Sequence, residues 1–589
     1  MEFINNFNSI NITDLHQQYF VSLWVELLNY NTIDSYRVRV MNAKTILAEL
    51  KEVIEDRIED DISKTNINFV AEEAERVITN DYICKKYYKS QTNFVIKELK
   101  ASKGGYKNSE ILKILHKTAL LRKELEENYF ELLINELEAE LFHNKNTENI
   151  KKLTIAFTTE LVSKGFSLKY LYNRKRLLTD SKFGTFKDRW DIFKSDIKNF
   201  KRRFKVVVKF TTTKEILGFK KILNIDINEK FTKKYDADKY ENEFDKLTGT
   251  LVATISELTA PDPISATAEA MYSFSLIQDL VRYEFRTSEC LIAPKVLIYD
   301  LDNANVFLVN SEYKPLGFVS IGDKARFEKQ VERFQKVTDD SDDFIENYSK
   351  ERLLNSFRYF RMSIDQKIPE TKFLNCWIAL EFLMKSGLHN TIIGQIVEYL
   401  PKLLVIQYTR KLLVDLSSNI SRSGFDMSIL PSIGIHLNEK NQIDKFEELY
   451  DALKDTGKVS IITSKTNDFL LKNRIIEIAD ILKDDESLKA KLTHHLENVK
   501  WNLQRIYRTR NKIVHSANIN VNLIQLEANL SYYFTSLFDY IIFVSTENDD
   551  IRSIEDFLLK CDARYEFLSN IIGSSTLKLT HKDLFYYKL

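Results

Sequence analysis

Glycine and proline are scarce in this chain, and their scarcity excludes several architectures. The 589 residues contain 14 glycines and 7 prolines, and the first proline is Pro261. An average protein has about 7% glycine and about 5% proline. Collagen-like, proline-rich and glycine-loop architectures are therefore excluded. Long stretches without helix-breaking residues predict a mainly helical protein.

Cysteine is also scarce, and the four cysteines are far apart in the sequence. No two of them form a C-x-x-C pair: Cys84, Cys290, Cys376 and Cys561. This spacing excludes a cysteine-based zinc site and a disulfide framework, and it suits a reducing compartment. The phosphate-binding, dinucleotide-binding and H-E-x-x-H motifs are absent as well. We therefore expect no metal and no cofactor.

The chain has neither an excess of one charge nor a long apolar run. Its 85 basic and 85 acidic residues give a net charge of zero. This excludes a protein that coats nucleic acid with a generally basic surface, so any contact with nucleic acid must come from a local basic patch. The most apolar window, 532–544, is short and contains Asp539, whereas a membrane span needs about 20 apolar residues. The first residues, Met-Glu-Phe-Ile-Asn-Asn, lack the basic region and apolar stretch of a secretory signal, so none is expected. We expect a soluble, cytoplasmic protein with no membrane partner.

What is present is 44% hydrophobic residues, enough for extensive cores. Their pattern divides the chain into a helical N-terminal region (1–200), a small α+β domain (201–335), a helical bundle (345–545) and a C-terminal tail (546–589). Strands are predicted where β-branched and aromatic residues gather, at 204–210, 222–227, 251–255, 295–299 and 305–309.

Proline, glycine, serine and acidic residues predict where the connections between these segments lie. A helix over 266–283 is entered through Pro261-Asp262-Pro263. The acidic run 339–343 predicts a linker, and the Ser/Gly/Pro-bearing stretch 417–440 predicts a loop. The overall prediction is a mainly α protein with one small α+β domain.

The helix predicted over 488–517 has an unusual polar residue on its apolar face. At about 100° per residue, its apolar side chains gather in one stripe, and Arg510 falls in the middle of that stripe. Asn511 and His515, one turn apart, lie at its edge. Burying an unpaired guanidinium costs several kcal/mol, so Arg510 needs an anion. That anion is either a structural carboxylate or the phosphate of a ligand.

A carboxylate for Arg510 is available in the sequence. Glu381 flanks the apolar stripe of the helix predicted over 371–386 and can face the helix that contains Arg510. In that case Arg510 and Glu381 form a buried structural pair without chemistry.

The hexapeptide Arg510-Asn511-Lys512-Ile513-Val514-His515 resembles the R-x4–6-H motif of HEPN-domain proteins. Residues 377–381, Trp-Ile-Ala-Leu-Glu, resemble an upstream helix of the ApeA-like branch of that superfamily. The resemblance implies a C-terminal HEPN-like helical bundle that dimerises. Many HEPN proteins are metal-independent ribonucleases used in antiviral defence, abortive infection and toxin–antitoxin systems, and others are non-catalytic RNA-binding or partner-binding modules.

The residue types fit ribonuclease chemistry. RNA supplies its own nucleophile, the 2′-OH. Histidine exchanges protons near neutral pH, so His515 is the expected acid or base. Arg510 can bind the scissile phosphate in bidentate fashion, and Asn511 can hydrogen-bond the phosphate or orient the histidine ring. The expected products are 2′,3′-cyclic phosphate and 5′-hydroxyl ends.

Neighbouring residues receive supporting roles. Arg508 and Lys512 border the motif and are expected to contact RNA, whereas Arg505 and Glu381 are expected to support the site. Two basic-aromatic stretches, 170–176 and 200–205, are further RNA-binding candidates or, more simply, solvated faces.

The expected partners follow from the same motif. Arg510 and His515 point about 140° apart on an ideal helix, so a composite site requires a homodimer, or a higher oligomer, in which two motif helices meet. The expected substrate is tRNA or another cellular RNA. Residues 1–200 are expected to sense a trigger, such as a phage-derived one, or to regulate the nuclease. The alternative is a non-catalytic HEPN-type protein for dimerisation, RNA binding or partner binding, in which Arg510 is sealed against Glu381.

Overall fold

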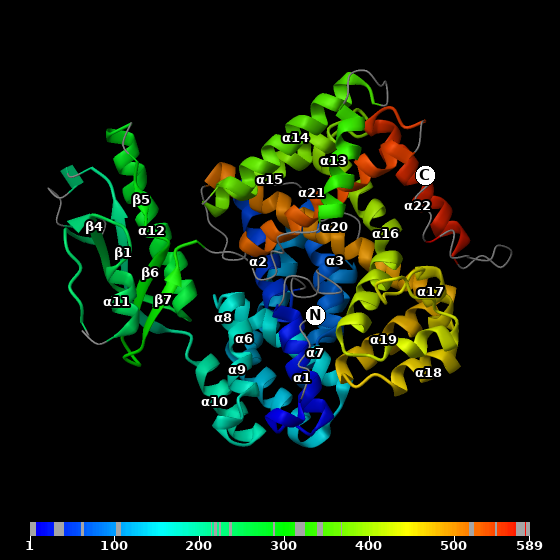
Figure 1. The fold of residues 1–589 in the computed structure, drawn as a ribbon, viewed down its shortest axis with the longest axis horizontal. Coiled ribbons are helices and arrows are strands. Elements are labelled where there is room, and N and C mark those ends of the chain that lie inside the picture. The colour runs from blue at the N-terminus through cyan, green and yellow to red at the C-terminus, as the bar shows by residue number, and fades with distance from the viewer. Residues whose placement is uncertain are drawn as a thin grey trace.

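The structure is a computed structural model, and most of the chain is described in it. The described residues are 7–28, 41–60, 64–101, 108–213, 215–216, 221–222, 225–234, 238–286, 289–312, 324–338, 345–366, 368–516, 523–547, 550–572 and 584. They form a mainly helical protein with one small antiparallel sheet (Figure 1). The prediction of a mainly α protein with a little β structure is confirmed. No described helix is long and apolar enough to cross a membrane.

The N-terminal region is a set of helices around one continuous apolar core. Its helices are α1 Leu15–Leu28, α2 Ala43–Asp60, α3 Lys64–Asn80, α4 Tyr82–Tyr87, α5 Lys89–Ala101, α6 Asn108–Ala139, α7 Thr147–Ser163, α8 Leu168–Asn173, α9 Lys175–Thr179 and α10 Phe186–Lys198. Trp24 is fully buried in this core, and its indole Nε1 donates to the carbonyl of Leu171 at 3.1 Å. The buried indole is thereby hydrogen-bonded as well as packed.

The sheet lies to one side of the helices in Figure 1. Its strands are β1 Arg202–Thr211, β2 Lys221–Ile222, β3 Ile225–Asn228, β4 Leu251–Ala260, β5 Leu291–Ile292, β6 Lys295–Asp300 and β7 Val306–Asn310, in the order β2-β3-β4-β1-β6-β7, with β5 paired to β1. Alternate residues of β1 face opposite sides. Phe210 packs on Phe274 of α12 (Pro263–Glu284), and Val207 faces the cluster that contains Phe244 of α11 (Lys239–Asp245).

One buried carboxylate joins the sheet region to the N-terminal helices. Asp262 caps α12 by accepting from the backbone N–H groups of Ile264 and Ser265 at 2.8 and 2.9 Å. The same carboxylate accepts from the backbone N–H and the hydroxyl of Ser167 at 2.8 and 3.0 Å. The helix that follows Pro261-Asp262-Pro263 is therefore positioned by the residue that starts it.

The remaining helices form the C-terminal part of the molecule. They are α13 Lys324–Thr338, α14 Asn347–Asp365, α15 Pro369–Met384, α16 Ile392–Arg422, α17 Phe446–Lys454, α18 Thr456–Ser464, α19 Phe469–Leu482, α20 Asp485–Ser516, α21 Leu523–Glu547 and α22 Ile554–Ile571. Trp377, Leu503 and Tyr533, from α15, α20 and α21, are completely buried in one shared core.

Three predicted segments differ from the observed ones. The strand predicted over 222–227 is two strands, because Ile222 pairs antiparallel with Ile225; a connection this short does not interrupt the apolar pattern. The loop predicted over 417–440 begins later, since α16 continues to Arg422. The tail 546–589 contains α22, whose Phe557 and Cys561 are buried in the α15–α20–α21 core. The predicted linker 339–343 lies outside the described residues.

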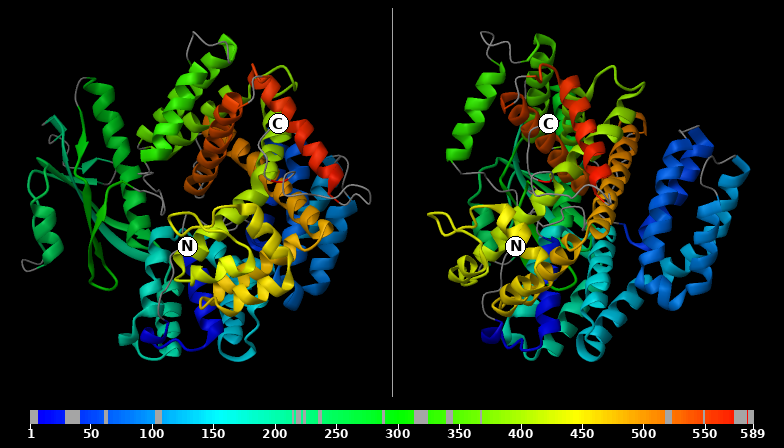
Figure 2. Two further views of the ribbon diagram at one scale, coloured as in Figure 1. Left: turned by 45° about the vertical axis from the view of Figure 1, so that its right-hand side comes forward. Right: turned by 90° about the vertical axis from the view of Figure 1, so that its right-hand side faces the viewer.

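The N-terminal and C-terminal helices pack on each other through ion pairs, one of which is completely buried. Arg474 of α19 contacts Glu26 of α1 at 3.3 Å, and both side chains are only 1% exposed. Lys151 of α7 contacts Glu477 of α19 at 2.8 Å. The two views of Figure 2 show helices of the N-terminal region, in blue, running alongside α20, in orange. The first 200 residues therefore share an interface with the helix that contains the motif.

Asp415 of α16 gives an expected pH dependence of stability. Burial raises its pKa to about 6, although Lys411 and Arg422 act in the opposite direction, and its Oδ2 has no hydrogen-bond partner among the described residues. The pKa of Asp415 is higher in the folded protein than its ordinary value of 3.8, so the protonated carboxyl stabilises the fold below pH 3.8. This contribution is lost as the pH rises through 6. Asp415→Asn is expected to raise the free energy of unfolding by about 2 kcal/mol at pH 7.5 and hardly at all at pH 4, as urea titration at both pH values would measure. Equal effects at the two pH values would contradict this expectation.

Candidate functional site

The motif lies in the last turns of α20, which is held firmly against α21. Leu503 and Ile506 are completely buried. The amide oxygen of Asn502 accepts from the amide of Asn529 at 3.1 Å and from the hydroxyl of Tyr533 at 3.0 Å. These contacts fix the rotation of α20 about its axis, and so they fix the direction in which the following residues point.

Arg510 is partly buried, and it has no carboxylate partner among the described residues. Its Nη1 donates to the amide oxygen of the adjacent Asn511 at 3.1 Å. Its Nε is buried, and no hydrogen-bond partner for it exists among the described residues. No ion pair of Arg510 occurs in the part of the chain that the structure describes. Most of the hydrogen-bonding and charge-pairing capacity of the guanidinium is therefore unused within the described residues.

His515 lies at the exposed end of α20. It is solvent-exposed, and the side chain of Val514 before it is 50% exposed. Asn511 is one turn earlier, so it shares a face with His515. Arg510, Asn511 and His515 are thus grouped in the last two turns, with the histidine accessible from solvent.

Arg505, one turn before the motif, is neutralised by the N-terminal region. Its guanidinium contacts Glu49 of α2 at 2.8 Å and Glu73 of α3 at 2.6 Å. Arg508 pairs with the same Glu49. All four side chains are about 90% buried or more, so each charge depends on the others for compensation.

The pKa values of the two glutamates differ because they compete for the same cations. Burial alone would raise the pKa of Glu49, but the charges of Arg505 and Arg508 lower it to about 2. Burial raises the pKa of Glu73, and the negative charge of Glu49 adds to this effect, so that Arg505 compensates it only in part. Glu49 is therefore the main counterion of the two arginines.

Lys512, within the motif itself, is also paired. Its Nζ contacts Asp56 of α2 at 2.8 Å and pairs with Glu52, one turn earlier on the same helix. Arg508 and Lys512, which the sequence predicted to contact RNA, are thus bound to carboxylates of α2 in this structure.

Glu381 does not contact Arg510 among the described residues. One of its carboxylate oxygens accepts from the indole Nε1 of Trp377 at 2.5 Å. The Trp377 ring in turn packs against Tyr507, with 5.8 Å between ring centroids. Glu381 therefore lies in the layer of side chains beneath α20 and orients Trp377.

The two basic-aromatic stretches form local ion pairs. Arg202 contacts Asp196 at 2.8 Å, and Arg203 contacts Asp302 at 2.8 Å. Arg174 stacks over the ring of Tyr170 at 4.2 Å. The Arg202–Asp196 pair joins β1 to α10, and the Arg203–Asp302 pair joins β1 to the turn after β6.

The acidic partners of α20 were not foreseen from the sequence. A signal for them existed on α2, because Glu49, Glu52 and Asp56 follow an i, i+3, i+7 spacing and share one helix face. Such a face is usually solvated, so the spacing alone does not identify what it binds.

Comparison of the chain with protein-family models, with curated proteins and with solved structures found no match.

Proposed function

We propose that the protein is a metal-independent endoribonuclease of the HEPN type, with Arg510, Asn511 and His515 as its catalytic residues. The observation that carries this proposal is Arg510, a partly buried guanidinium with no carboxylate partner in the described part of the chain. It lies two turns from a helix end that exposes His515. A protein that keeps such a cation stabilises it with a bound anion, and the RNA phosphate is the anion that fits the neighbouring histidine.

The proposed reaction is transesterification at phosphorus. One His515 takes the proton from the ribose 2′-OH as the 2′-oxygen forms a bond to phosphorus. Arg510 stabilises the charge that develops on the phosphoryl oxygens. The bond from phosphorus to the 5′-oxygen breaks, and the leaving oxygen receives a proton from a second His515. The products are a 2′,3′-cyclic phosphate and a 5′-hydroxyl.

The second His515 is supplied by a homodimer in this proposal. Lys372, near the beginning of α15, contacts Glu527, near the beginning of α21, at 3.3 Å. Because α21 begins at Leu523, soon after α20 ends at Ser516, the beginning of α15 and the end of α20 lie at the same end of the bundle. Apolar side chains are exposed there: Ile364 by 50%, Ile368 by 42% and Val514 by 50%. Burying them against a symmetry mate would bring two motif helices together.

The N-terminal region regulates the nuclease in this proposal. Carboxylates of α2 occupy Arg508 and Lys512, which would otherwise contact the phosphates of RNA. Release of these ion pairs by a trigger would expose a basic helix end. The proposed substrate is tRNA or another cellular RNA, and the proposed setting is antiphage defence or abortive infection in the cytoplasm.

The test is inducible expression of the wild type, Arg510→Ala and His515→Ala, with growth measured and cellular RNA ends sequenced. Arg203→Ala and the exposed His436→Ala serve as matched controls. New 5′-hydroxyl ends are expected in the wild type and in both controls, and not in the two motif variants. The same set is repeated under phage challenge, because a trigger is part of the proposal. Motif variants that protect as well as the wild type would exclude a catalytic role.

The same ion pairs favour a second function, a non-catalytic HEPN-type module. In that case α20 is permanently a docking surface for α2 and α3, and the basic residues next to the motif serve assembly alone. RNA ends that are identical in all five proteins, with and without phage, would select this function.

Reversing the charge of the α2 face is expected to strengthen RNA binding. Glu52→Lys/Asp56→Lys removes two carboxylates that pair with Lys512 and adds repulsion. These are exposed or half-buried residues, so stability should change by about 1 kcal/mol or less, while RNA binding at 100 mM salt should tighten by about tenfold. Fluorescence anisotropy with a labelled RNA in the His515→Ala background measures this change without cleavage.

The matched control is Glu55→Lys on the same helix, since Glu55 pairs with Lys51 and not with α20. An equal gain in RNA affinity from Glu55→Lys would show that total charge, and not release of Lys512, is responsible.

A further inference from the structure

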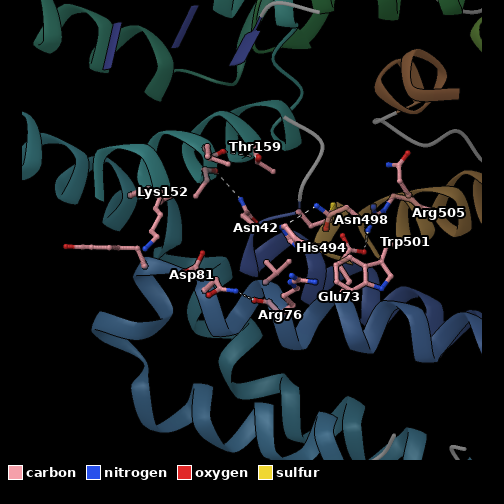
Figure 3. A pocket seen from close by; sticks show the side chains of 18 residues that line it. Asn42, Glu73, Arg76, Asp81, Lys152, Thr159, His494, Asn498, Trp501 and Arg505 are labelled. Carbon is pink, nitrogen blue, oxygen red and sulfur yellow. Dashed lines mark hydrogen bonds and ion pairs between the residues drawn. The ribbon is translucent and has the colours of Figure 1, made fainter. Parts of the chain in front are cut away.

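A cavity of about 310 Å³ lies where helices of the N-terminal region meet α20 (Figure 3). Its walls come from α3, α4, α6, α7 and α20. This volume is at the lower end of the range of about 300–1,000 Å³ for small-molecule sites. The cavity lies beside the motif helix and away from the motif itself, so the proposed ribonuclease reaction does not use it.

The walls of the cavity are largely apolar and include one aromatic ring. Ile155 and Ala156 of α7 and Val77 of α3 contribute aliphatic surface, and Trp501 of α20 contributes its indole. Trp501 is 7% exposed, whereas the three other tryptophans of the chain are completely buried elsewhere. An apolar slot with an indole in its wall suits a planar aromatic ring.

Two amides on α20 add hydrogen-bonding capacity to this wall. Asn502 is 5% exposed and uses its amide oxygen for Asn529 and Tyr533. Its amide nitrogen has no partner among the described residues. Asn498, one turn earlier, uses its amide nitrogen toward His494 at 3.4 Å, and its oxygen has no partner within the described part of the chain. The cavity therefore presents a donor and an acceptor on one helix face.

The cavity also has basic residues where it opens to solvent. Arg76 and Lys152 line it, and their side chains are 33% and 45% exposed. Arg76 pairs with Glu497 and Lys152 pairs with Glu148, so a phosphate would compete with these two exposed carboxylates. The guanidinium of Arg76 lies 5.7 Å from the centroid of the Trp501 ring, and Figure 3 shows Arg76 and Trp501 on neighbouring helices. A cation near an aromatic ring is a common arrangement for holding a phosphate next to a stacked base.

From these contacts we infer that the cavity binds a purine nucleotide, with the base against Trp501 and the phosphate toward Arg76 and Lys152. The donor of Asn502 and the acceptor of Asn498 match the adjacent acceptor and donor on the edge of an adenine. Glu73 and Arg505 line the same cavity, so a bound nucleotide would touch the ion pair that holds α3 to α20. The inference stands independently of the proposed nuclease activity.

The test is titration of the full-length protein with AMP, followed by tryptophan fluorescence and by calorimetry. Saturable binding is expected in the wild type by both methods. Trp501→Phe should lose most of the fluorescence change. Ala156→Phe, which fills the cavity without removing a contact, should weaken binding by at least about tenfold, and Asn498→Ala by about five- to tenfold. Thermal unfolding verifies that each variant is folded.

Other ligands test the assignment of base and phosphate. Adenosine should bind about tenfold more weakly than AMP, and ribose 5-phosphate should not bind measurably. The natural ligand could be a free nucleotide or the terminal nucleotide of an RNA. An RNA decamer added to the His515→Ala variant separates the two, because it competes with AMP only if the cavity accepts the end of an RNA. Absence of any AMP response up to about 5 mM, equal binding by Ala156→Phe, or equal binding of ribose 5-phosphate would overturn the inference.

Discussion

Arg510→Ala is expected to lower the rate of RNA cleavage by about 10²–10³-fold, because one guanidinium that stabilises transition-state charge is lost. The same substitution should change the free energy of unfolding by less than about 1 kcal/mol. Removing the buried Nε, which has no partner among the described residues, offsets the loss of the apolar part of the side chain. Single-turnover cleavage of a labelled RNA and urea denaturation measure the two quantities.

Arg510→Lys is the informative companion variant. Lysine keeps the charge but not the bidentate geometry, so cleavage should remain at least about tenfold below that of the wild type. A fall in stability of about 3 kcal/mol in Arg510→Ala would instead show that this arginine has a structural partner. Unchanged cleavage in a folded Arg510→Ala dimer would end its assignment as a catalytic residue.

Arg505→Ala, five residues earlier on the same helix, is expected to lower the free energy of unfolding by about 3–5 kcal/mol. Among the described residues, the substitution leaves Glu49 paired only with Arg508 and leaves Glu73 buried with no ion-pair partner. Two buried carboxylates without adequate compensation are costly, and protonation of Glu73, whose pKa is already raised, recovers part of this cost. Urea denaturation at pH 7 measures the loss.

Arg203→Ala is the matched control for this stability effect. Arg203 also binds a carboxylate, that of Asp302, but its side chain is 55% exposed, so the loss should be much smaller than in Arg505→Ala. Adding Glu73→Gln to Arg505→Ala should restore about 1–2 kcal/mol, because a neutral amide is easier to bury than a carboxylate. Similar losses in Arg203→Ala and Arg505→Ala would contradict the account of the buried cluster.

Local sequence patterns were sufficient for much of the fold. The scarcity of glycine and proline predicted the helical class, and clusters of β-branched residues located β1 and β6 to within two residues. The pattern failed at the β2–β3 pair, and it did not identify α22 within the predicted tail. In both places the deciding event is a chain reversal or a distant packing contact, which leaves little trace in the spacing of neighbouring residues.

The sequence by itself determined that a long helix ends in Arg510, Asn511 and His515, because helical periodicity and the absence of breakers act within one segment. Only the tertiary structure decided which cations of that helix are neutralised. Glu49 and Arg505 are 456 positions apart, and no local pattern relates residues at that separation. The cavity beside Trp501 was decided in the same way, since its walls exist only where helices of the N-terminal region pack against α20. The physical reason is that burial and charge compensation depend on which surfaces meet, and this is a property of the folded chain.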